Sequence, residues 1–232
     1  MSSDSGSLIE RHDAGRAALT GKPAIRGGLI VVSAPSGAGK SSLIERVLTR
    51  IPGLQYSVSY TTREARGPER NGVDYHFVSE DVFLAMRGRG EFIESARVHG
   101  HLYGTRASAI EAEMAAGCDV ILDIDVQGAE QIREKMREAV TVFVLPPSQQ
   151  VLVARLSRRN LNTAADLARR LVNASNEVGK FEEFDYVIIN DDLEPASAAL
   201  ESIILAERNR PPRQRQRIEP IIETFRGGVS NG

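Results

Sequence analysis

Short runs of apolar residues, each bounded by glycines or polar residues, recur along the organised part of the chain. They lie at 29–32 (LIVV), 119–125 (DVILDID), 140–145 (VTVFVL) and 185–190 (DYVIIN). Their length and their β-branched residues predict buried strands, and the intervals between them carry helical patterns. Strands that alternate with helices in this way predict an α/β fold with a parallel core sheet flanked by helices on both faces.

Other stretches of the chain depart from this alternation. Residues 57–104 contain shorter and more polar runs, such as 74–78 (DYHFV) and 91–98 (EFIESARV), which predict the small strands of an inserted lobe. Residues 1–26 are polar and weakly periodic, which predicts a mobile leader. The basic, proline-broken stretch 208–217 is more typical of a solvated helix end than of a nucleic-acid contact.

A loop rich in small residues, SAPSGAGKSS at 33–42, follows the first apolar run. After it, Leu43, Val47 and Leu48 recur at helical spacing, so the loop joins a strand to a helix. Glycines let backbone N–H groups turn inward, and a helix N-terminus adds unpaired donors and partial positive charge. The loop therefore predicts a phosphate cradle. A plain turn of small residues is the alternative, with a weight of roughly one in twenty in this context.

Two side chains of this loop carry the predicted chemistry. Lys40 would reach the outer phosphates of a nucleotide, and the Ser41 hydroxyl would hold a magnesium ion that bridges them. Ala34 stands where the general phosphate-loop pattern has its first glycine. Alanine is small enough to keep the backbone close to a ligand.

A second anion site is predicted within 57–78. Arg63 and Arg66 can fork onto a phosphate there, and the Tyr75 hydroxyl can add a donor without charge. The segment also holds Glu69 and two pairs of hydroxyl residues. A lone arginine is usually a surface charge, but the segment is dense in phosphate ligands and poor in core-forming residues, which favours a binding site.

Net charge, cysteine content and the lack of long apolar segments restrict the kinds of molecule that this protein can bind and where it can be located. The net charge of −2 over 232 residues gives no general attraction to nucleic acid or anionic membrane. Cys118 is the one cysteine of the chain and cannot form an internal disulfide, which fits a reducing compartment. The N-terminus lacks the apolar core of a secretory signal, and no stretch is long enough to span a bilayer. We therefore expect a cytoplasmic protein that binds small molecules; the oligomeric state is not readable from the sequence.

Several separated motifs together resemble those of the guanylate kinase family, in the family's order and over about residues 27–210. They are SAPSGAGKSSL (33–43), TTREARGPERNGVDYHFV (61–78), LDIDVQG (122–128), LPPS (145–148) and IINDD (188–192). The resemblance implies a P-loop kinase fold with an inserted mixed-β GMP-binding lobe and a helical lid. It also implies transfer of the γ-phosphoryl group of Mg-ATP to GMP, giving ADP and GDP, in purine nucleotide metabolism.

The resemblance implies a division of the chain. A leader (1–26) precedes the guanylate-kinase-like domain (27–210), and a basic C-terminal tail (211–232) follows it. Within the domain the implied parts are a core (27–56, 105–148 and 171–207), a GMP-binding lobe (57–104) and a lid (149–170).

The resemblance also implies roles for the matching residues. ATP would be bound by Ala34, Pro35, Ser36, Gly37, Ala38, Gly39, Lys40, Ser41, Ser42 and Asn190. GMP would be bound by Ser59, Arg63, Arg66, Glu69, Tyr75, Glu94, Tyr103, Thr105 and Asp125; Ser59, Glu94 and Asp125 match the positions that contact guanine. Magnesium would be held near Ser41 and Asp123. The catalytic group would be Lys40, Arg155, Arg159 and Arg170. Because Asn160 stands where the family commonly has glycine, Arg158 stays an alternative to Arg159, and Arg169 is likewise an alternative to Arg170.

The chemistry of such a transfer agrees with this set of residues. A nucleoside monophosphate already offers an anionic oxygen as the nucleophile, so no general base is required. The protein must hold two polyanions in line and offset their repulsion.

Two alternatives remain: a catalytically dead module that binds protein partners, and a kinase of the same fold with another acceptor. The presence of Lys40, Ser41 and the arginines argues against the first, and the three guanine-facing residues argue against the second.

Overall fold

The computed structural model describes residues 25–98, 100–157 and 164–227. Its core is a parallel sheet with strand order β2-β7-β1-β8-β9. The strands are β1 (Leu29–Ser33), β2 (Leu54–Tyr56), β7 (Asp119–Asp123), β8 (Val140–Leu145) and β9 (Tyr186–Ile189). The predicted α/β class and all four predicted strands are confirmed.

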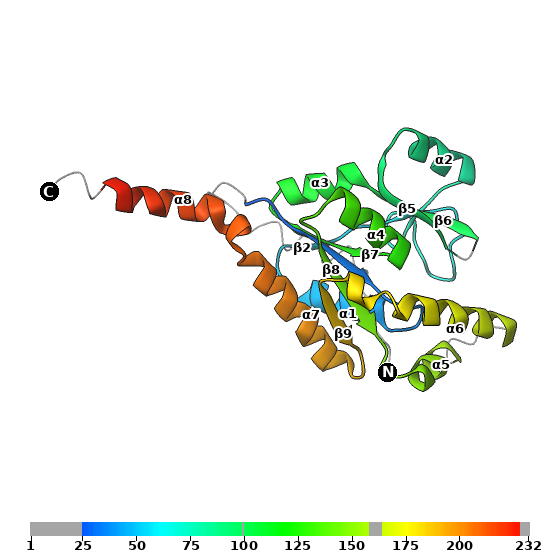
Figure 1. The fold of residues 1–232 in the computed structure, drawn as a ribbon. Coiled ribbons are helices and arrows are strands. Elements are labelled where there is room, and N and C mark those ends of the chain that lie inside the picture. The colour runs from blue at the N-terminus through cyan, green and yellow to red at the C-terminus, as the bar shows by residue number, and fades with distance from the viewer. Residues whose placement is uncertain (1–24, 99, 158–163, 228–232) are drawn as a thin grey trace.

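Helices cover both faces of this sheet (Figure 1). On one face lie α1 (Lys40–Arg50) and α7 (Leu193–Arg208), which pack on Ile30 and Val32 of β1. On the other lie α3 (Ala107–Ala115) and α4 (Val126–Lys135), which pack on Leu29 and Val31. Successive side chains of a strand point to opposite faces, so a strand covered on both sides is apolar throughout. This explains the unbroken apolar run that begins the organised chain.

A second, smaller sheet stands beside the core, with strand order β4-β3-β6-β5. It comprises β3 (Tyr60–Thr61), β4 (His76–Phe77), β5 (Phe92–Val98) and β6 (His101–Arg106), with α2 (Glu80–Gly88) packed against it. The sheet is mixed, because β3 and β4 are parallel while the other pairs are antiparallel. The small strands expected at 74–78 and 91–98 are therefore present.

Beyond β8 the chain forms α5 (Gln149–Ser157) and α6 (Ala164–Val178), which share a small apolar cluster of Leu152, Leu156, Leu167, Leu171 and Ala174. The predicted lid ended at residue 170, but α6 continues to Val178 because its apolar face continues to Ala174. The short helix η2 (Phe181–Glu183) then leads into β9.

Two predictions about the ends of the chain need correction. Arg26, assigned to the leader, pairs with Glu111 of α3. The stretch 208–217 is not one helix end: α7 stops at Arg208 and a new helix, α8 (Pro211–Gly227), begins at once. Proline suits the first turn of a helix, which explains why the same prolines that end one helix begin the next. No helix in the described part of the chain is long and apolar enough to cross a membrane.

A buried carboxylate ties α7 and α8 to the core sheet. Asp119 opens β7 and is 2 % exposed. Its Oδ1 accepts hydrogen bonds from Gly28 N (2.7 Å) and Arg213 Nη2 (2.6 Å), and its Oδ2 accepts one from Arg208 Nε (2.6 Å). One side chain therefore connects the first strand, the seventh strand and both C-terminal helices.

We expect Asp119→Ala to lower the free energy of unfolding by about 3 kcal/mol, because it leaves two partly buried arginines and a backbone donor without their acceptor. Urea unfolding followed by circular dichroism measures this change. Asp81→Ala, at an exposed position of α2, is the matched control and should change the free energy by less than about 0.5 kcal/mol. Equal effects of the two substitutions would contradict an anchoring role for Asp119.

Candidate functional site

The predicted phosphate loop connects β1 to α1 and has the backbone that its glycines permit. Gly37 and Gly39 have φ values of 92° and 95°, which side chains with a Cβ rarely adopt. Side chains from other segments also hold the loop in place by hydrogen bonds to its backbone. The buried amide of Asn190 donates to Ala38 O at 2.7 Å, and Arg155 Nη1 donates to the same oxygen at 3.2 Å. A Cβ on Gly39 would lie 2.3 Å from Asn190 Nδ2, so this support requires glycine.

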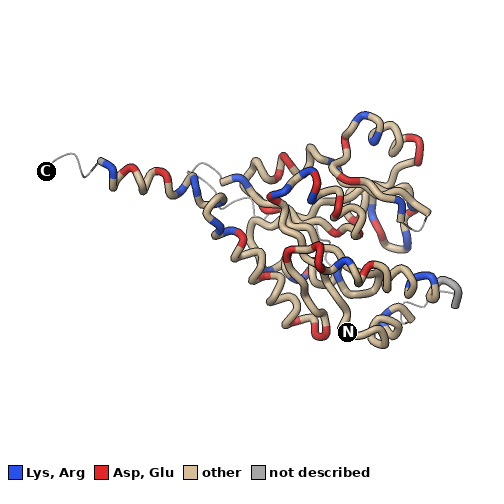
Figure 2. The backbone as a smooth tube through the Cα atoms, in the orientation of Figure 1, with Lys and Arg blue, Asp and Glu red and all other residues tan. Residues whose placement is uncertain are grey.

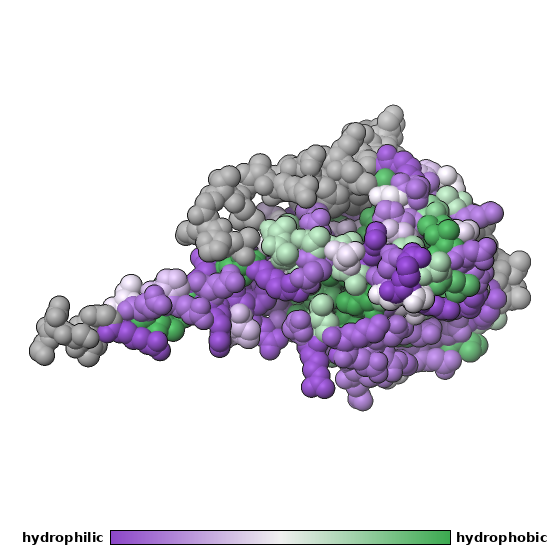
Figure 3. All heavy atoms as spheres, turned by 90° about the horizontal axis from the view of Figure 1, so that it is seen from above, coloured by the Kyte–Doolittle hydropathy of each residue, from purple (hydrophilic) through white to green (hydrophobic). Residues whose placement is uncertain are grey.

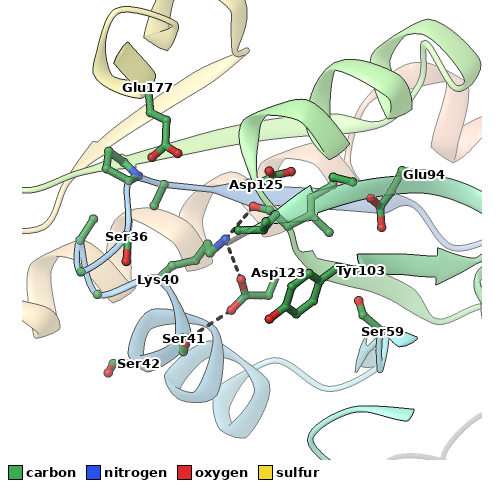
Figure 4. A pocket seen from close by; sticks show the side chains of 18 of the residues that line it. Ser36, Lys40, Ser41, Ser42, Ser59, Glu94, Tyr103, Asp123, Asp125 and Glu177 are labelled. Atoms are coloured by element: carbon green, nitrogen blue, oxygen red, sulfur yellow. Dashed lines mark hydrogen bonds and ion pairs between the residues drawn. The ribbon is translucent and has the colours of Figure 1, made fainter. Parts of the chain in front are cut away.

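The first residues of α1 meet the end of β7 (Figure 4). Lys40 Nζ lies 2.7 Å from Asp123 Oδ1 and donates to Ile124 O at 2.6 Å. Ser41 Oγ donates to Asp123 Oδ2 at 3.1 Å. The parallel pairing of Val32 with Asp123 brings these groups together, because it aligns the carboxyl ends of neighbouring strands.

The hydroxyl of Ser41 and the carboxylate of Asp123 are hard oxygen donors, which suit Mg²⁺. Within the described ranges no group of three or more His, Cys, Asp or Glu residues is placed to hold a metal. A magnesium ion here would therefore take its remaining ligands from phosphates and water, as is usual for this ion.

A chain of buried polar groups lies on the second sheet. Thr105 Oγ1 donates to Glu94 Oε1 at 2.6 Å, and Ser59 Oγ is 3.2 Å from Thr105 Oγ1. Asp125 caps α4, since its Oδ1 accepts from Gly128 N at 2.9 Å. A Cβ on Gly128 would lie 2.8 Å from Glu94 Oε2, so a larger residue at this position of α4 would make the carboxylate shift. The sequence reasoning missed Gly128, although it quoted the LDIDVQG motif that contains it.

Burial raises the pKa of Glu94 to about 7. The side chain is almost fully enclosed, and the negative charge of Asp125 raises its pKa further, while the hydrogen bond from Thr105 opposes the shift. A carboxyl group with this pKa changes its charge near neutral pH. It can therefore respond to a ligand that offers hydrogen-bond donors.

The arginines of the predicted second anion site are organised by Glu69. Arg63 is 7 % exposed and binds both carboxylate oxygens of Glu69 at 2.9 Å. Glu69 Oε2 also accepts from Arg66 N at 2.7 Å. The hydrogen bond from Arg63 lowers the pKa of Glu69, so this carboxylate stays ionised. Tyr75 and Tyr103 meet edge to face at 5.9 Å, and the Arg63 guanidinium lies 5.2 Å from the Tyr75 ring centre.

The described lid arginines reach the phosphate loop from α5 and α6. Besides Ala38 O, Arg155 donates to Asn190 O at 2.9 Å, and Arg170 Nη1 lies 3.5 Å from Ser36 Oγ. Arg158 and Arg159 lie outside the described residues. Two of the three arginines predicted to act in transfer therefore border the loop that would hold the donor phosphates.

A pocket of about 290 Å³ joins the loop to the second sheet, between groups that are far apart in the sequence. Its lining includes residues 34–42, Ser59, Tyr75, Glu94, Tyr103, Asp123, Asp125 and Glu177. The lining does not include seven other predicted residues: Arg63, Arg66, Glu69, Thr105, Arg155, Arg170 and Asn190. Of these, Thr105, Arg155, Arg170 and Asn190 form hydrogen bonds with lining residues.

Glu177 of α6 is a pocket residue that the sequence reasoning missed. Its carboxylate points toward the loop (Figure 4). Burial, with the charge of Asp125, raises its pKa to about 7, while Lys40 opposes the shift. No local sequence signal distinguishes Glu177 from a surface glutamate of an amphipathic helix.

Glu177→Gln should stabilise the protein more at pH 8 than at pH 5. The folded carboxyl keeps its proton up to about pH 7, whereas an ordinary glutamate loses it near its usual pKa of 4.5, so this group's contribution to stability falls as pH rises between those values. Glutamine removes that loss, and we expect about 1–2 kcal/mol at pH 8 after solvent screening.

Urea unfolding of parent and variant at the two pH values measures the difference. Glu182→Gln, at an exposed position of η2, serves as the control. A gain from Glu177→Gln that is the same at both pH values would show that its carboxyl titrates normally.

A parallel α/β sheet with a strand, glycine loop and helix around a phosphate cradle defines the phosphate-loop class of nucleotide-binding proteins. Comparison with known proteins is more specific. The family model described as "Guanylate kinase" matches residues 26–207. The chain belongs to the guanylate kinase family.

Individual relatives agree with this assignment. The chain is 46 % identical over 210 residues to a guanylate kinase of Chromohalobacter salexigens, covering 90 % of this chain and 98 % of that protein. It is 47 % identical over 197 residues to a guanylate kinase of Nitrosomonas europaea, covering 85 % and 98 %. The crystal structure of guanylate kinase from Anaplasma phagocytophilum superposes with a TM-score of 0.68 at 34 % identity, covering 84 % of this chain and 95 % of that one.

Proposed function

We propose that this chain is a kinase that transfers the γ-phosphoryl group of Mg-ATP to GMP, giving ADP and GDP, in purine nucleotide metabolism. The observation that carries the proposal is one pocket in which the phosphate loop with Lys40 faces the Glu94 carboxylate of the second sheet. Membership of the guanylate kinase family supports both the donor and the acceptor.

On the donor side, the backbone N–H groups of the loop would bind the ATP phosphates. Lys40 would leave Asp123 and donate to the outer phosphates, where it offsets negative charge as the phosphoryl group moves. A magnesium ion held by Ser41 and Asp123 would neutralise the phosphates and orient them. Arg155 and Arg170 lie close enough to the loop to add positive charge on the transferred group.

On the acceptor side, we assign the sheet within 57–104 to GMP. Glu69 holds Arg63 rigidly, so the guanidinium can meet the GMP phosphate together with Tyr75 and Tyr103. The phosphate oxygen is itself the nucleophile, so these groups only have to position it. Residues 149–170 would act as the lid that excludes water when both nucleotides are bound.

Guanine would be recognised by hydrogen bonds to buried groups. Its N1–H and 2-amino group are donors and can bond to the Glu94 carboxylate, with Asp125 as a further acceptor and the Ser59 hydroxyl near O6. Adenine has no donor at N1 and would leave Glu94 buried and unpaired. A site of this kind can discriminate by roughly 10⁴.

A magnesium requirement and a cytoplasmic location belong to the same proposal. The Ser41 and Asp123 oxygens support magnesium. Cys118 is buried and forms no disulfide, which suits a reducing compartment.

Lys40→Met tests the donor site, because methionine keeps the length of the side chain and removes its charge. We expect ADP release with Mg-ATP and GMP to fall by about 10² or more, while GMP affinity measured by calorimetry stays within about threefold. The control is Arg46→Met, a change of charge on the exposed side of α1. Near-normal turnover of the Lys40 variant would place the donor elsewhere.

Glu94→Gln tests the acceptor site. In the parent, GMP affinity should weaken as pH falls below about 7, because protonation of Glu94 removes an acceptor for the guanine donors. The variant should lose this pH dependence and show a lower ratio of kcat/KM for GMP over AMP, with ATP affinity unchanged.

The measurement is a coupled ADP assay with GMP, AMP, UMP and CMP at pH 6 and pH 8. A parent that prefers another monophosphate contradicts the proposed acceptor. An unchanged GMP/AMP ratio in the variant removes only Glu94 from base recognition.

A further inference from the structure

Charged residues of both signs are spread along the described chain (Figure 2), and hydrophilic side chains cover much of the described surface that Figure 3 shows. Exposed charges are solvated and screened by salt, so they distinguish one uncharged base from another poorly. Buried hydrogen-bonding groups distinguish ligands far better, because a wrong ligand leaves them unpaired. Selectivity between bases therefore depends on how the buried acceptors of the pocket are held in place.

The helix α4 lies between the two sheets and contacts both of them (Figure 1). One side of the helix is packed in the hydrophobic cluster of the core sheet. Gly128, Gln131 and Lys135 are three and four positions apart, so they follow one another along a second stripe of the helix. All three contact β5, the strand that carries Glu94.

Two polar side chains of this stripe bond to the backbone of β5 on either side of Glu94. Gln131 Oε1 accepts from Ser95 N at 3.1 Å, and Gln131 Nε2 donates to Ser95 O at 3.0 Å. Lys135 Nζ donates to Ile93 O. Because β5 is at the edge of the described sheet, its outer backbone groups have no partner strand there. The Gln131 amide takes the place of a peptide group of such a strand, and the residues before and after Glu94 are both fixed to one helix.

The same helix fixes Asp125, the second acceptor assigned to guanine. Asp125 is the N-cap of α4, and its Oδ1 accepts from Gly128 N at 2.9 Å. The Glu94 carboxylate lies directly beside this first turn, since a Cβ on Gly128 would be 2.8 Å from Glu94 Oε2. Glu94 comes from the second sheet, whereas Asp125 follows β7 of the core sheet. The contacts of α4 with β5 therefore set the distance between the two carboxylates.

We propose that Gln131 and Lys135 are positioning residues for base selectivity, which fix β5 to α4 so that Glu94 and Asp125 can accept from guanine together. This inference rests on the proposed use of GMP as the acceptor. Guanine is rigid and its N1–H and 2-amino donors have one fixed separation, so both bonds form well only if the spacing of the two acceptors is fixed as well. Burial is the main influence on the pKa of Glu94 and raises it, whereas the charge of Lys135 lowers it and so favours the ionised acceptor.

Gln131→Met tests the proposal, because methionine keeps the length of the side chain and removes both hydrogen bonds to Ser95. In a coupled ADP assay kcat/KM for GMP should fall about tenfold, and that for AMP by less than about twofold, since AMP does not use the two acceptors together. The affinity for ATP should not change. Glu134→Met, at an exposed position of α4, is the matched control and should keep the GMP/AMP ratio of the parent. A purely structural role would lower the thermal unfolding midpoint and leave this ratio unchanged.

Lys135→Met tests the other side of the same contact at an exposed position, where the substitution should not affect folding. It should lower the GMP/AMP ratio about threefold. It should also move the pH dependence of GMP affinity to higher pH, because a charge that opposes protonation of Glu94 is lost.

A double variant shows whether Gln131 acts through Glu94. In the Glu94→Gln background, Gln131→Met should change the GMP/AMP ratio by less than about twofold, because the carboxylate that it positions is gone; independent residues would each keep their full effect. A further tenfold loss in that background overturns the inference, and so does an unchanged ratio in Gln131→Met or Lys135→Met, even where the parent prefers GMP. A parent that does not prefer GMP overturns the proposed function, and this inference with it.

Discussion

The ion pair between Lys40 and Asp123 depends on the parallel pairing of β1 with β7, and the rest of the site depends on the same pairing. This strand pairing places the end of β7 beside the phosphate loop and the start of α4 beside Glu94. The loop itself is held by Asn190, which follows the edge strand β9, and by Arg155 of α5. A cradle for phosphates therefore rests on contacts from three distant segments, which keep its donors oriented before any ligand arrives.

Several carboxyl groups line the pocket. Glu94, Asp125 and Glu177 line it together, and two of these carboxyl groups have a pKa near 7. Burying them costs stability in the free protein. A ligand that offered hydrogen-bond donors to Glu94 would offset that cost. Glu177 faces the phosphate loop, so an anion bound there would oppose its ionisation.

Around Arg63, in contrast, the buried charge is paired with a group of opposite charge. Glu69 neutralises Arg63 and fixes its direction, and the guanidinium lies over the aromatic rings of Tyr75 and Phe77. Sequence motifs predicted the residues of this site, but they did not reveal that the acidic residue acts on the arginine. Asn190 was expected to bind ATP, and the described contact of its amide is with the phosphate loop. Its role toward ATP stays a prediction.

Local patterns in the sequence were sufficient to predict the core strands, the glycine loop and the small strands of the second sheet. These elements depend on the spacing of apolar residues and on turn-forming residues, and both are properties of neighbouring positions along the chain. Tertiary structure alone decided that Glu177 enters the pocket, that Gly128 makes room for Glu94, and that α8 stands away from the body. Each of these depends on which distant segments meet. The periodicity of apolar residues in the sequence does not predict such contacts, because they result from how whole elements pack on one another.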